Sequence, residues 1–414
     1  MIAYDRFTLT NGLRILVHRD TSTPIVAINI LYNVGSRDEQ PDRTGFAHLF
    51  EHLMFGGSKN IPKYDAPLER VGGENNAFTN NDITNYYLTV PVQNLETAFW
   101  LESDRMADLA FSPKSLEVQR NVVVEEFKQN YLNQPYGDAW LLLRPLAYKM
   151  HPYQWATIGK DIAHIEQAKM DEVKDFYHRF YNPNNAILTI AGDVDLENIH
   201  LLCEKWFGPI TKDHPLSRSI PAEPPQTSPR KLEVQRDVPY DAIYKVYHMC
   251  DRRNPAYYAS DLISDILSGG KSARFYNELI KKRQLFSDIN AYITGDIDGG
   301  LFVVTGKLIK GVEMAVAEEA INIELGKIRL QEVEEKELQK VKNRVESSLI
   351  FSELSVLDKA MNLAYYEWLG EPSLINSTID RYLAVNAGEI KTEANKILRE
   401  ENCSTLYYYS TQKA

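Results

Sequence analysis

The chain repeats itself, and this internal repeat limits the folds open to its 414 residues more than any other feature. In the first half, a strand-like run at 24–33 leads through a loop into a helix that ends at Gly56-Gly57. In the second half, a strand-like run at 242–249 leads into a helix that ends at Gly269-Gly270, 213 positions later. Such self-similarity indicates a tandem duplication of one structural unit rather than two unrelated domains.

A proline-rich segment separates the two repeated halves. Residues 215–231 contain five prolines and almost no apolar periodicity, which is typical of an extended linker. We therefore predict one domain over 1–214 and a second, homologous domain over 232–414. Asn11-Gly12 separates two alternating runs, a pattern typical of a β-hairpin. Strands and helices gather in groups rather than in strict alternation, so we expect an α+β fold, each domain having a mainly antiparallel sheet with helices packed on it.

Composition argues against several classes of protein. The net charge of −11 argues against a nucleic-acid partner, because phosphate binding needs a basic surface. No apolar run approaches the roughly 18 residues of a membrane-spanning helix, and no signal peptide is visible. Cys203, Cys250 and Cys403 are too few and too far apart for a disulfide framework or a cysteine-based zinc site. We therefore expect a cytoplasmic protein without a membrane partner.

The segment His48-Leu49-Phe50-Glu51-His52 is the most informative for chemistry. On a helix, positions 48, 51 and 52 fall within an arc of about 100°. Two imidazoles one turn apart can bind one Zn²⁺, and a carboxylate beside them can take a proton from zinc-bound water. This order, H-x-x-E-H, is the inverse of the common zincin motif. The alternative is a surface helix with two ordinary histidines, but Leu49 and Phe50 indicate a largely buried helix.

A catalytic zinc site normally has three protein ligands, so one more is expected from elsewhere in the chain. The segment 119–126 reads Q-R-N-V-V-V-E-E and offers two adjacent acids, Glu125 and Glu126, on an apolar helix. Helix periodicity alone leaves both acids open as the third ligand.

Several longer motifs make the chain resemble a known family. The matching segments are G-S-R-D-E (35–39), G-F-A-H-L-F-E-H-L-M-F-G-G (45–57), G-G-E-N-N-A-F-T-N-N-D-I-T-N-Y-Y (72–87), Q-R-N-V-V-V-E-E (119–126), H-P-Y (151–153) and S-G-G-K-S-A-R-F-Y (268–276). They resemble the pitrilysin, insulin-degrading enzyme and mitochondrial processing peptidase family of inverted-zincin metallopeptidases, particularly its short bacterial members. Together they span nearly the whole chain.

This resemblance implies that the chain is an enzyme, and it implies which residues bind zinc and act in catalysis. It implies two homologous domains that enclose a chamber for unfolded peptides, with the zinc-binding catalytic domain at 1–214 and a zinc-less one at 232–414. His48 and His52 match the family's zinc histidines, Glu51 its general base and Glu126, in preference to Glu125, its distal zinc ligand. The chain is therefore expected to be a zinc endopeptidase. Some relatives have a further glutamate at the position of Gln119, so no second-carboxylate role is expected there.

Two further segments match the family less strongly. Asn76-Ala77-Phe78 matches its substrate-binding edge strand, to which a peptide adds as an extra strand. The alternative for this polar segment is a plain solvated loop. His151, in H-P-Y, is better interpreted as a structural histidine in a turn.

The second half repeats the fold without the zinc motif. At the 213-residue offset, the three motif positions become Asp261, Ser264 and Asp265, so one zinc ion per chain is expected. Gly269-Gly270-Lys271-Ser272 resembles the end of a phosphate-binding loop, but the upstream glycine of that motif is missing.

A missing residue pair predicts a partner chain. The zinc-less half of the family's self-sufficient members supplies an arginine and, seven residues later, a tyrosine that hold the substrate. The matching positions here are Ile280 and Ser287, and a slipped register would use Arg283 or Tyr292. We therefore expect the catalytic subunit of a heterodimer whose zinc-less partner supplies this pair. The alternatives are a homodimer or self-sufficient monomer, and, from another class, a non-catalytic assembly subunit.

Overall fold

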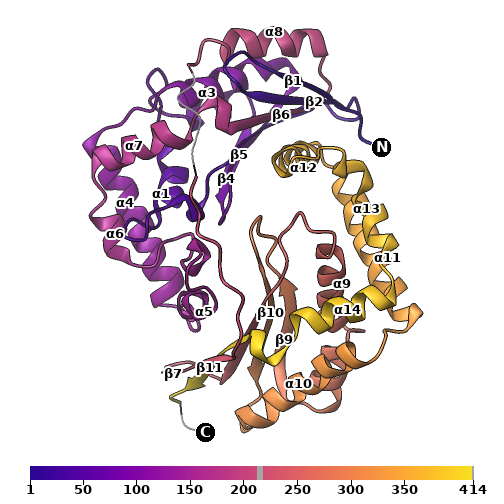
Figure 1. The fold of residues 1–414 in the computed structure, drawn as a ribbon. Helices are drawn as coiled ribbons and strands as arrows, with labels where there is room; N and C mark the ends of the chain where they lie inside the picture. Colours follow the sequence, from indigo (N-terminus) through magenta and orange to yellow (C-terminus); the bar gives the residue numbers. More distant parts are fainter. Residues whose placement is uncertain (212–217, 413–414) are drawn as a thin grey trace. The chain divides into compact units, whose positions relative to one another are not determined.

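The computed structural model describes residues 1–211 and 218–412, which group into two compact units. Each unit is built around its own sheet and takes in residues from both halves of the sequence (Figure 1). The predicted domains, 1–214 and 232–414, are instead two continuous stretches of the sequence. The first unit comprises Met1–Lys128, Trp155–Ile220 and Ile350–Ser377, and the second comprises Gln129–Gln154, Pro221–Leu349 and Thr378–Ala414.

The sheet of the first unit has six strands in the order β1-β2-β6-β3-β5-β4. All neighbouring pairs are antiparallel except β2 and β6. The central strand β3 is rich in Ile and Val, residues that favour strands, and almost all of it is buried. The strands are β1 (Asp5–Thr8), β2 (Arg14–Arg19), β3 (Ile25–Tyr32), β4 (Glu74–Thr79), β5 (Thr84–Pro91) and β6 (Ala186–Gly192).

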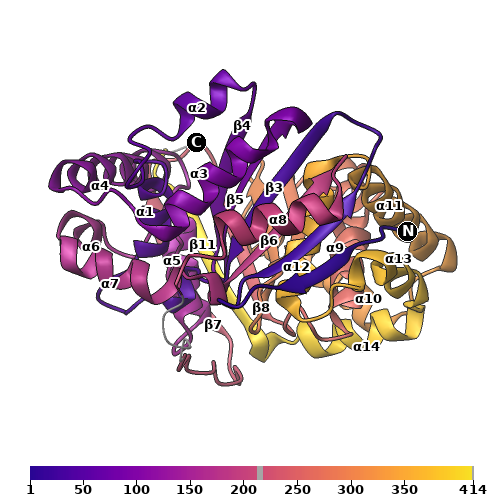
Figure 2. The ribbon, with the colours of Figure 1, turned by 90° about the horizontal axis from the view of Figure 1, so that it is seen from above.

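Helices cover both faces of this sheet. α3 and α8 lie over one face and α12 lies over the other (Figures 1 and 2). α1 packs against β4, α4 and α7. These helices are α1 (Phe46–Leu53), α2 (Asp65–Arg70), α3 (Leu95–Ala107), α4 (Pro113–Phe127), α6 (Ile162–Glu166), α7 (Met170–Phe180), α8 (Leu196–Trp206) and α12 (Val356–Leu369).

The sheet of the second unit has five strands in the order β7-β11-β8-β10-β9. Only β7 and β11 are parallel. α9, α10 and α14 belong to one hydrophobic core with this sheet, and α5 belongs to a second. The elements are β7 (Arg230–Arg236), β8 (Ala242–His248), β9 (Phe286–Ile293), β10 (Leu301–Leu308), β11 (Cys403–Ser410), α5 (Ala139–Ala147), α9 (Tyr257–Ser268), α10 (Met314–Leu330) and α14 (Ala387–Ile397). α11 (Glu335–Ser352) and α13 (Leu374–Ala384) each contain residues of both units.

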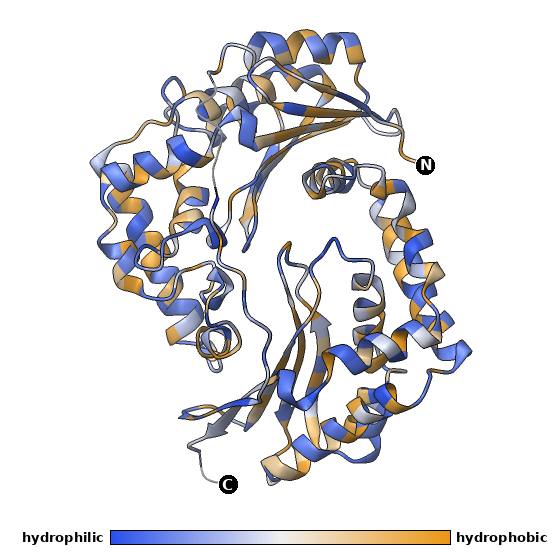
Figure 3. Ribbon diagram, in the orientation of Figure 1, coloured by the Kyte–Doolittle hydropathy of each residue, from blue (hydrophilic) through white to orange (hydrophobic). Residues whose placement is uncertain are grey.

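The two sheets share one topology. Without β1, the first sheet reads β2-β6-β3-β5-β4, which matches β7-β11-β8-β10-β9 strand by strand, including the single parallel pair. A duplicated unit is expected to give this correspondence, and the mixed α+β architecture is confirmed. In Figure 3 the long helices alternate between polar and apolar residues, as expected of helices with one buried face.

Each unit contains one helix from the other half of the sequence. α5 is encoded in the first half but packs on the second sheet, and α12 is encoded in the second half but packs on β3 and β6. Small residues let α12 approach closely, because Ala360 packs against Ala27 and Ala191. The Thr189 hydroxyl donates a hydrogen bond to the carbonyl oxygen of Ala360 at 2.8 Å.

Most of the predicted elements are present. The hairpin around Gly12 forms between β1 and β2, with Gly12 at a φ of 92°. Of the predicted linker, 215–217 lie outside the described residues, 218–229 contain no helix or strand, and β7 begins at Arg230. Within the described ranges, no helix is both long and apolar enough to cross a bilayer.

Candidate metal and peptide site

The helix α1 carries the H-x-x-E-H segment with its polar side chains on one side. Phe46, Ala47, Leu49, Phe50 and Leu53 are buried, and they anchor the helix in the core of the first unit. The side chains of His48, Glu51 and His52 are only partly buried. The apolar spacing therefore fixes which way the three polar side chains face.

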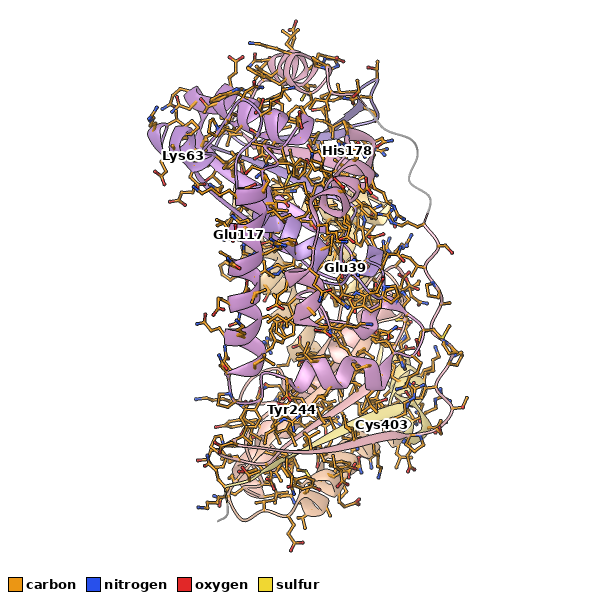
Figure 4. The ribbon with its side chains drawn as sticks, turned by 90° about the vertical axis from the view of Figure 1, so that its left-hand side faces the viewer. Glu39, Lys63, Glu117, His178, Tyr244 and Cys403 are labelled. Atoms are coloured by element: carbon orange, nitrogen blue, oxygen red, sulfur yellow. The ribbon has the colours of Figure 1, made fainter. Side chains whose placement is uncertain are left out.

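The start of α1 is held by a buried carboxyl group. Glu39 is 6% exposed, and its two carboxyl oxygens accept hydrogen bonds from the backbone N–H groups of Gly45 and Ala47, both at 2.9 Å. These N–H groups have no partner within the helix, so Glu39 supplies what a capping side chain normally would. Burial raises the pKa of Glu39 well above its usual range, against the effect of the two hydrogen bonds. Glu39 is labelled in Figure 4.

Two histidines and one glutamate converge at the exposed side of α1. The Nε2 atoms of His48 and His52 lie 3.7 and 3.5 Å from Oε2 of Glu126, which belongs to α4. One ligand atom from each residue lies within 4.8 Å of the others. Ligands about 2.1 Å from a tetrahedral zinc ion lie roughly 3.4 Å from one another, so the two measured distances suit such an ion.

The protonation states also suit a cation. Burial, followed by the nearby His52, lowers the pKa of His48 to about 4, so its imidazole is neutral at pH 7. The hydrogen bond from His52 lowers the pKa of Glu126, which is therefore anionic. Nδ1 of His48 is buried and has no hydrogen-bond partner among the described residues. Imidazole nitrogens and a carboxylate oxygen are a donor set that zinc favours.

Glu51 lies between the histidines and the edge strand β4. Its carboxylate forms hydrogen bonds with both the side chain and the backbone of Thr79, the last residue of β4. Burial raises the pKa of Glu51 above its usual range, which makes its carboxylate a stronger base than an exposed one.

The predicted substrate segment Asn76-Ala77-Phe78 forms part of β4 rather than a loop. β4 pairs with β5 on one side and is the last strand of its sheet on the other. Its residues alternate between exposed and half-buried, and Phe78 is 40% exposed. An edge strand of this kind can accept an added peptide strand.

The structure separates the remaining candidates from the three convergent residues. Glu125 faces away, and its side chain is 71% exposed and pairs with Lys128 at 2.7 Å. His151 is buried in the second unit, where its Nε2 lies 3.1 Å from Asp298 and its Nδ1 accepts a hydrogen bond from the Tyr153 backbone.

The matching helix of the second unit carries no histidine–carboxylate cluster. On α9, Asp261 accepts a hydrogen bond from the Tyr382 hydroxyl at 2.6 Å, and Asp265 lies 3.4 Å from the guanidinium of Arg344. Within the described part of the chain, His48, His52 and Glu126 form the one group of at least three side chains with metal-ligand spacing.

Sequence reasoning missed the roles of Glu39 and Thr79. The sequence signal for Glu39 was weak, because this acid lies six residues before Gly45, the glycine that opens α1. Thr79 had no signal beyond its place at the end of a polar segment, because its contact with Glu51 depends on how β4 packs against α1.

Comparison with known families gives two matches along the chain. Residues 14–154 match the family model described as insulinase (peptidase family M16), and residues 167–345 match the model described as peptidase M16 inactive domain. The two models cover most of the chain without overlap.

Two curated bacterial proteins are similar along nearly their whole length. The zinc protease PqqE of Helicobacter pylori is 27% identical over 412 residues, covering 98% of this chain and 92% of that protein. An uncharacterised zinc protease of Bacillus subtilis, YmxG, is 24% identical over 404 residues, covering 97% of each.

Solved structures share the fold. A protease from Helicobacter pylori superposes with a TM-score of 0.93 at 26% identity, covering 99% of this chain and 100% of that one. A peptidase M16 inactive domain from Pseudomonas fluorescens superposes with a TM-score of 0.90 at 18% identity, covering 99% and 98%. The second likeness concerns the fold alone.

Proposed function

Because this chain belongs to the M16 (insulinase) family of peptidases, we propose that it is a zinc-dependent endopeptidase that hydrolyses unfolded peptides. The observation that carries the proposal is the convergence of His48, His52 and Glu126 beside Glu51 and the edge strand β4. Relatives over the full length are named zinc proteases, which supports the same metal and reaction.

Each side chain has a role in this proposal. His48, His52 and Glu126 hold one zinc ion, which would polarise a peptide carbonyl and make water easier to deprotonate. Glu51 takes a proton from the attacking water at its carboxylate and passes it to the amide nitrogen of the departing peptide. The hydrogen bonds from Thr79 fix the direction of that carboxylate.

The peptide would bind by adding a strand to β4. Backbone hydrogen bonds along Asn76, Ala77 and Phe78 would hold it extended, whatever its sequence. Because Thr79 of the same strand bonds to Glu51, a peptide on β4 would be aligned with the base. An unfolded peptide has free backbone groups along its length, whereas most of those in a folded protein are already paired.

A direct test uses a quenched, unstructured peptide and a folded protein that contains the same sequence. The zinc-loaded enzyme should cleave the unstructured peptide and spare the folded protein. A chelator should abolish cleavage and added Zn²⁺ should restore it. Cleavage that continues without bound metal would exclude the proposal.

We also propose that the chain acts with a zinc-less homologous partner that supplies an arginine and tyrosine pair. Ile280 packs against the core of the second unit, and the Ser287 hydroxyl donates to the Lys307 carbonyl. Neither side chain has the polar reach of the expected pair. Arg283 follows a π-helical segment (Tyr276–Lys282), and Tyr292 lies on β9, three and five residues beyond the matched positions.

The partner has a test of its own. The isolated chain should bind zinc yet cleave peptides poorly, and activity should appear with a homologous subunit that lacks H-x-x-E-H. Full turnover by the isolated chain, as a monomer or homodimer, would exclude this part of the proposal. If no assembly is active while zinc stays bound, the chain is a non-catalytic assembly subunit.

The cysteines support a cytoplasmic location as part of this proposal. Cys203, Cys250 and Cys403 are free, and Cys203 and Cys403 are buried. Unpaired cysteines are usual where thiols stay reduced. Fractionation of cells that produce the tagged chain would test it, and recovery outside the cytoplasm would contradict it.

A further inference from the structure

A polar cavity lies in the second unit, and none of its lining residues belongs to the proposed peptidase site. Its volume is about 320 Å³, which is within the range of small-ligand sites. α10 lines one side, and β7, β8 and β11 line the other. Cys403, at the start of β11 and labelled in Figure 4, is one of the lining residues.

Strand alternation places charged side chains in this cavity. Neighbouring side chains of a strand point to opposite faces of a sheet. On β8, Tyr244 therefore packs in the core that includes α5, whereas Lys245 faces α10 and bonds to its Glu318. Lys231, on β7, lines the same side of the sheet.

Glu318 is the less exposed of the two acids that line the cavity, and both of its oxygens accept hydrogen bonds. Oε1 of Glu318 accepts a hydrogen bond from the Lys245 ammonium at 2.5 Å, and Oε2 accepts one from the Tyr407 hydroxyl at 2.8 Å. The other lining acid, Glu400, is exposed to solvent. Both oxygens of Glu318 therefore already accept a hydrogen bond, and its single negative charge is balanced by Lys245.

Arg329 supplies a donor without an acceptor. Its Nε is buried and has no hydrogen-bond partner among the described residues. Such unpaired buried donors are uncommon in folded proteins and call for an explanation. The Lys231 ammonium lies 5.9 Å from the ring centre of Tyr407, so a second cation faces the same region. The lining thus carries three cations, Lys231, Lys245 and Arg329, against two acids, Glu318 and Glu400, which leaves an excess of one positive charge.

A glycine inside a helix keeps the cavity open. Gly326 lies inside α10, four residues before its last residue, where glycine is less favourable than alanine. A Cβ atom added at Gly326 would meet no atom within 4 Å, so packing within the chain does not require glycine here. The missing side chain instead leaves room on the lining beside Arg329.

We propose that this cavity binds a small organic anion through its carboxylate or phosphate group. Arg329 and Lys231 would hold the anionic group, because a guanidinium suits both the planar and the tetrahedral oxyanion. The lining around Gly326 would receive the rest of the molecule. This site is independent of the proposed peptidase chemistry, since none of its residues belongs to the first unit.

Calorimetric titration of the full chain would test this site. The ligands are benzoate, phenyl phosphate and, as a neutral control, benzamide. At least one anion should bind saturably, and benzamide should not. Comparing benzoate with phenyl phosphate shows which oxyanion the site prefers.

Three variants decide whether the cavity is the site. Arg329→Gln should weaken anion binding by at least about tenfold, and Gly326→Leu, which fills the space, should abolish it. Lys327→Gln removes the same charge from α10 where Lys327 pairs with Glu324, and it should bind like the wild type. A circular dichroism spectrum establishes that each variant is folded.

The proposal is overturned if neither anion saturates the wild-type chain. It is also overturned if folded Arg329→Gln and Lys327→Gln bind the anion equally, because binding would then follow net charge alone. Lys231→Gln gives a second measure if Arg329→Gln does not fold, and unchanged binding in that variant counts against the site.

Discussion

Nε2 of His52 lies 3.5 Å from Oε2 of Glu126, although the two residues belong to separate helices, α1 and α4. His48 lies 3.7 Å from the same oxygen. The carboxylate of Glu126 therefore faces both imidazoles, whereas that of its neighbour Glu125 faces solvent. This arrangement favours Glu126 as the third zinc ligand.

Glu126→Gln should therefore weaken zinc binding by on the order of 100-fold or more, because an amide is a poorer ligand than a carboxylate. Glu125→Gln removes the same charge one residue away and should leave zinc affinity near normal. Competition with a chromogenic chelator measures both affinities. The reverse result would mean that the helix register is wrong by one residue.

Zinc stoichiometry should be one per chain. The second unit has Asp261 and Asp265 at the matching positions, and Tyr382 and Arg344 already engage them. His52→Ala should reduce the stoichiometry to nearly zero, because two remaining ligands hold zinc poorly. Elemental analysis after dialysis gives both values, and two tightly held ions per wild-type chain would contradict this account.

Glu39→Ala should lower the free energy of unfolding by about 2–4 kcal/mol, because it leaves the N–H groups of Gly45 and Ala47 unpaired in the core. Glu39→Gln keeps one acceptor oxygen and should lose less. Urea denaturation gives the comparison, with the exposed Asp42→Ala as control. Equal stability of Glu39→Ala and wild type would show that α1 does not depend on this cap.

The helix α4 shows how much of this site the sequence predicts. The motif on α1 fixes three polar residues by helix periodicity alone. The third ligand is harder to predict from the sequence, because the adjacent Val122, Val123 and Val124 do not show which side of α4 is buried. Val122 is in fact 43% exposed, whereas Val123 and Val124 are buried. The resemblance to a family, not the spacing, favoured Glu126.

The exchange of α5 and α12 could not be predicted for a different reason. Both helices are amphipathic segments whose patterns show that they bury one face but not which sheet covers it. The close packing of Ala360 against Ala27 and Ala191 depends on residues far apart in the sequence. The agreement between the strand orders of the two sheets, by contrast, is what the repeat leads one to expect.

A pH-dependent ion pair holds α12 in the first unit. Lys359 pairs with Asp20, and this hydrogen bond lowers the pKa of Asp20 below its usual range. A carboxyl group whose pKa is lowered by folding stabilises the folded state above its unfolded pKa, near 3.9, and loses that contribution as the pH falls.

Asp20→Asn should therefore cost about 1 kcal/mol at pH 7, and the difference from wild type should shrink below about pH 4. Asp193→Asn, which breaks an exposed pair with Arg19, should cost less than about 0.5 kcal/mol at any pH. Denaturation at several pH values tests both. A cost for Asp20→Asn that stays constant down to pH 3 would contradict the assignment.

Peptide binding on β4 predicts a dependence on backbone amides. N-methylation of alternate residues of an unstructured substrate should raise KM about tenfold or more when the methylated amides face β4. Methylation of the interleaved residues, whose amides face away, is the matched control and should change KM little. Equal effects of the two patterns would exclude strand addition.

The most direct test of the central claim compares wild type with Glu51→Gln in the same assembled enzyme, measuring zinc content and peptide cleavage on one preparation. The substitution leaves His48, His52 and Glu126 in place, so both proteins should hold one zinc ion per chain. Loss of the general base should reduce cleavage by about 10²- to 10⁴-fold. Wild-type cleavage by Glu51→Gln at equal zinc content would contradict the account.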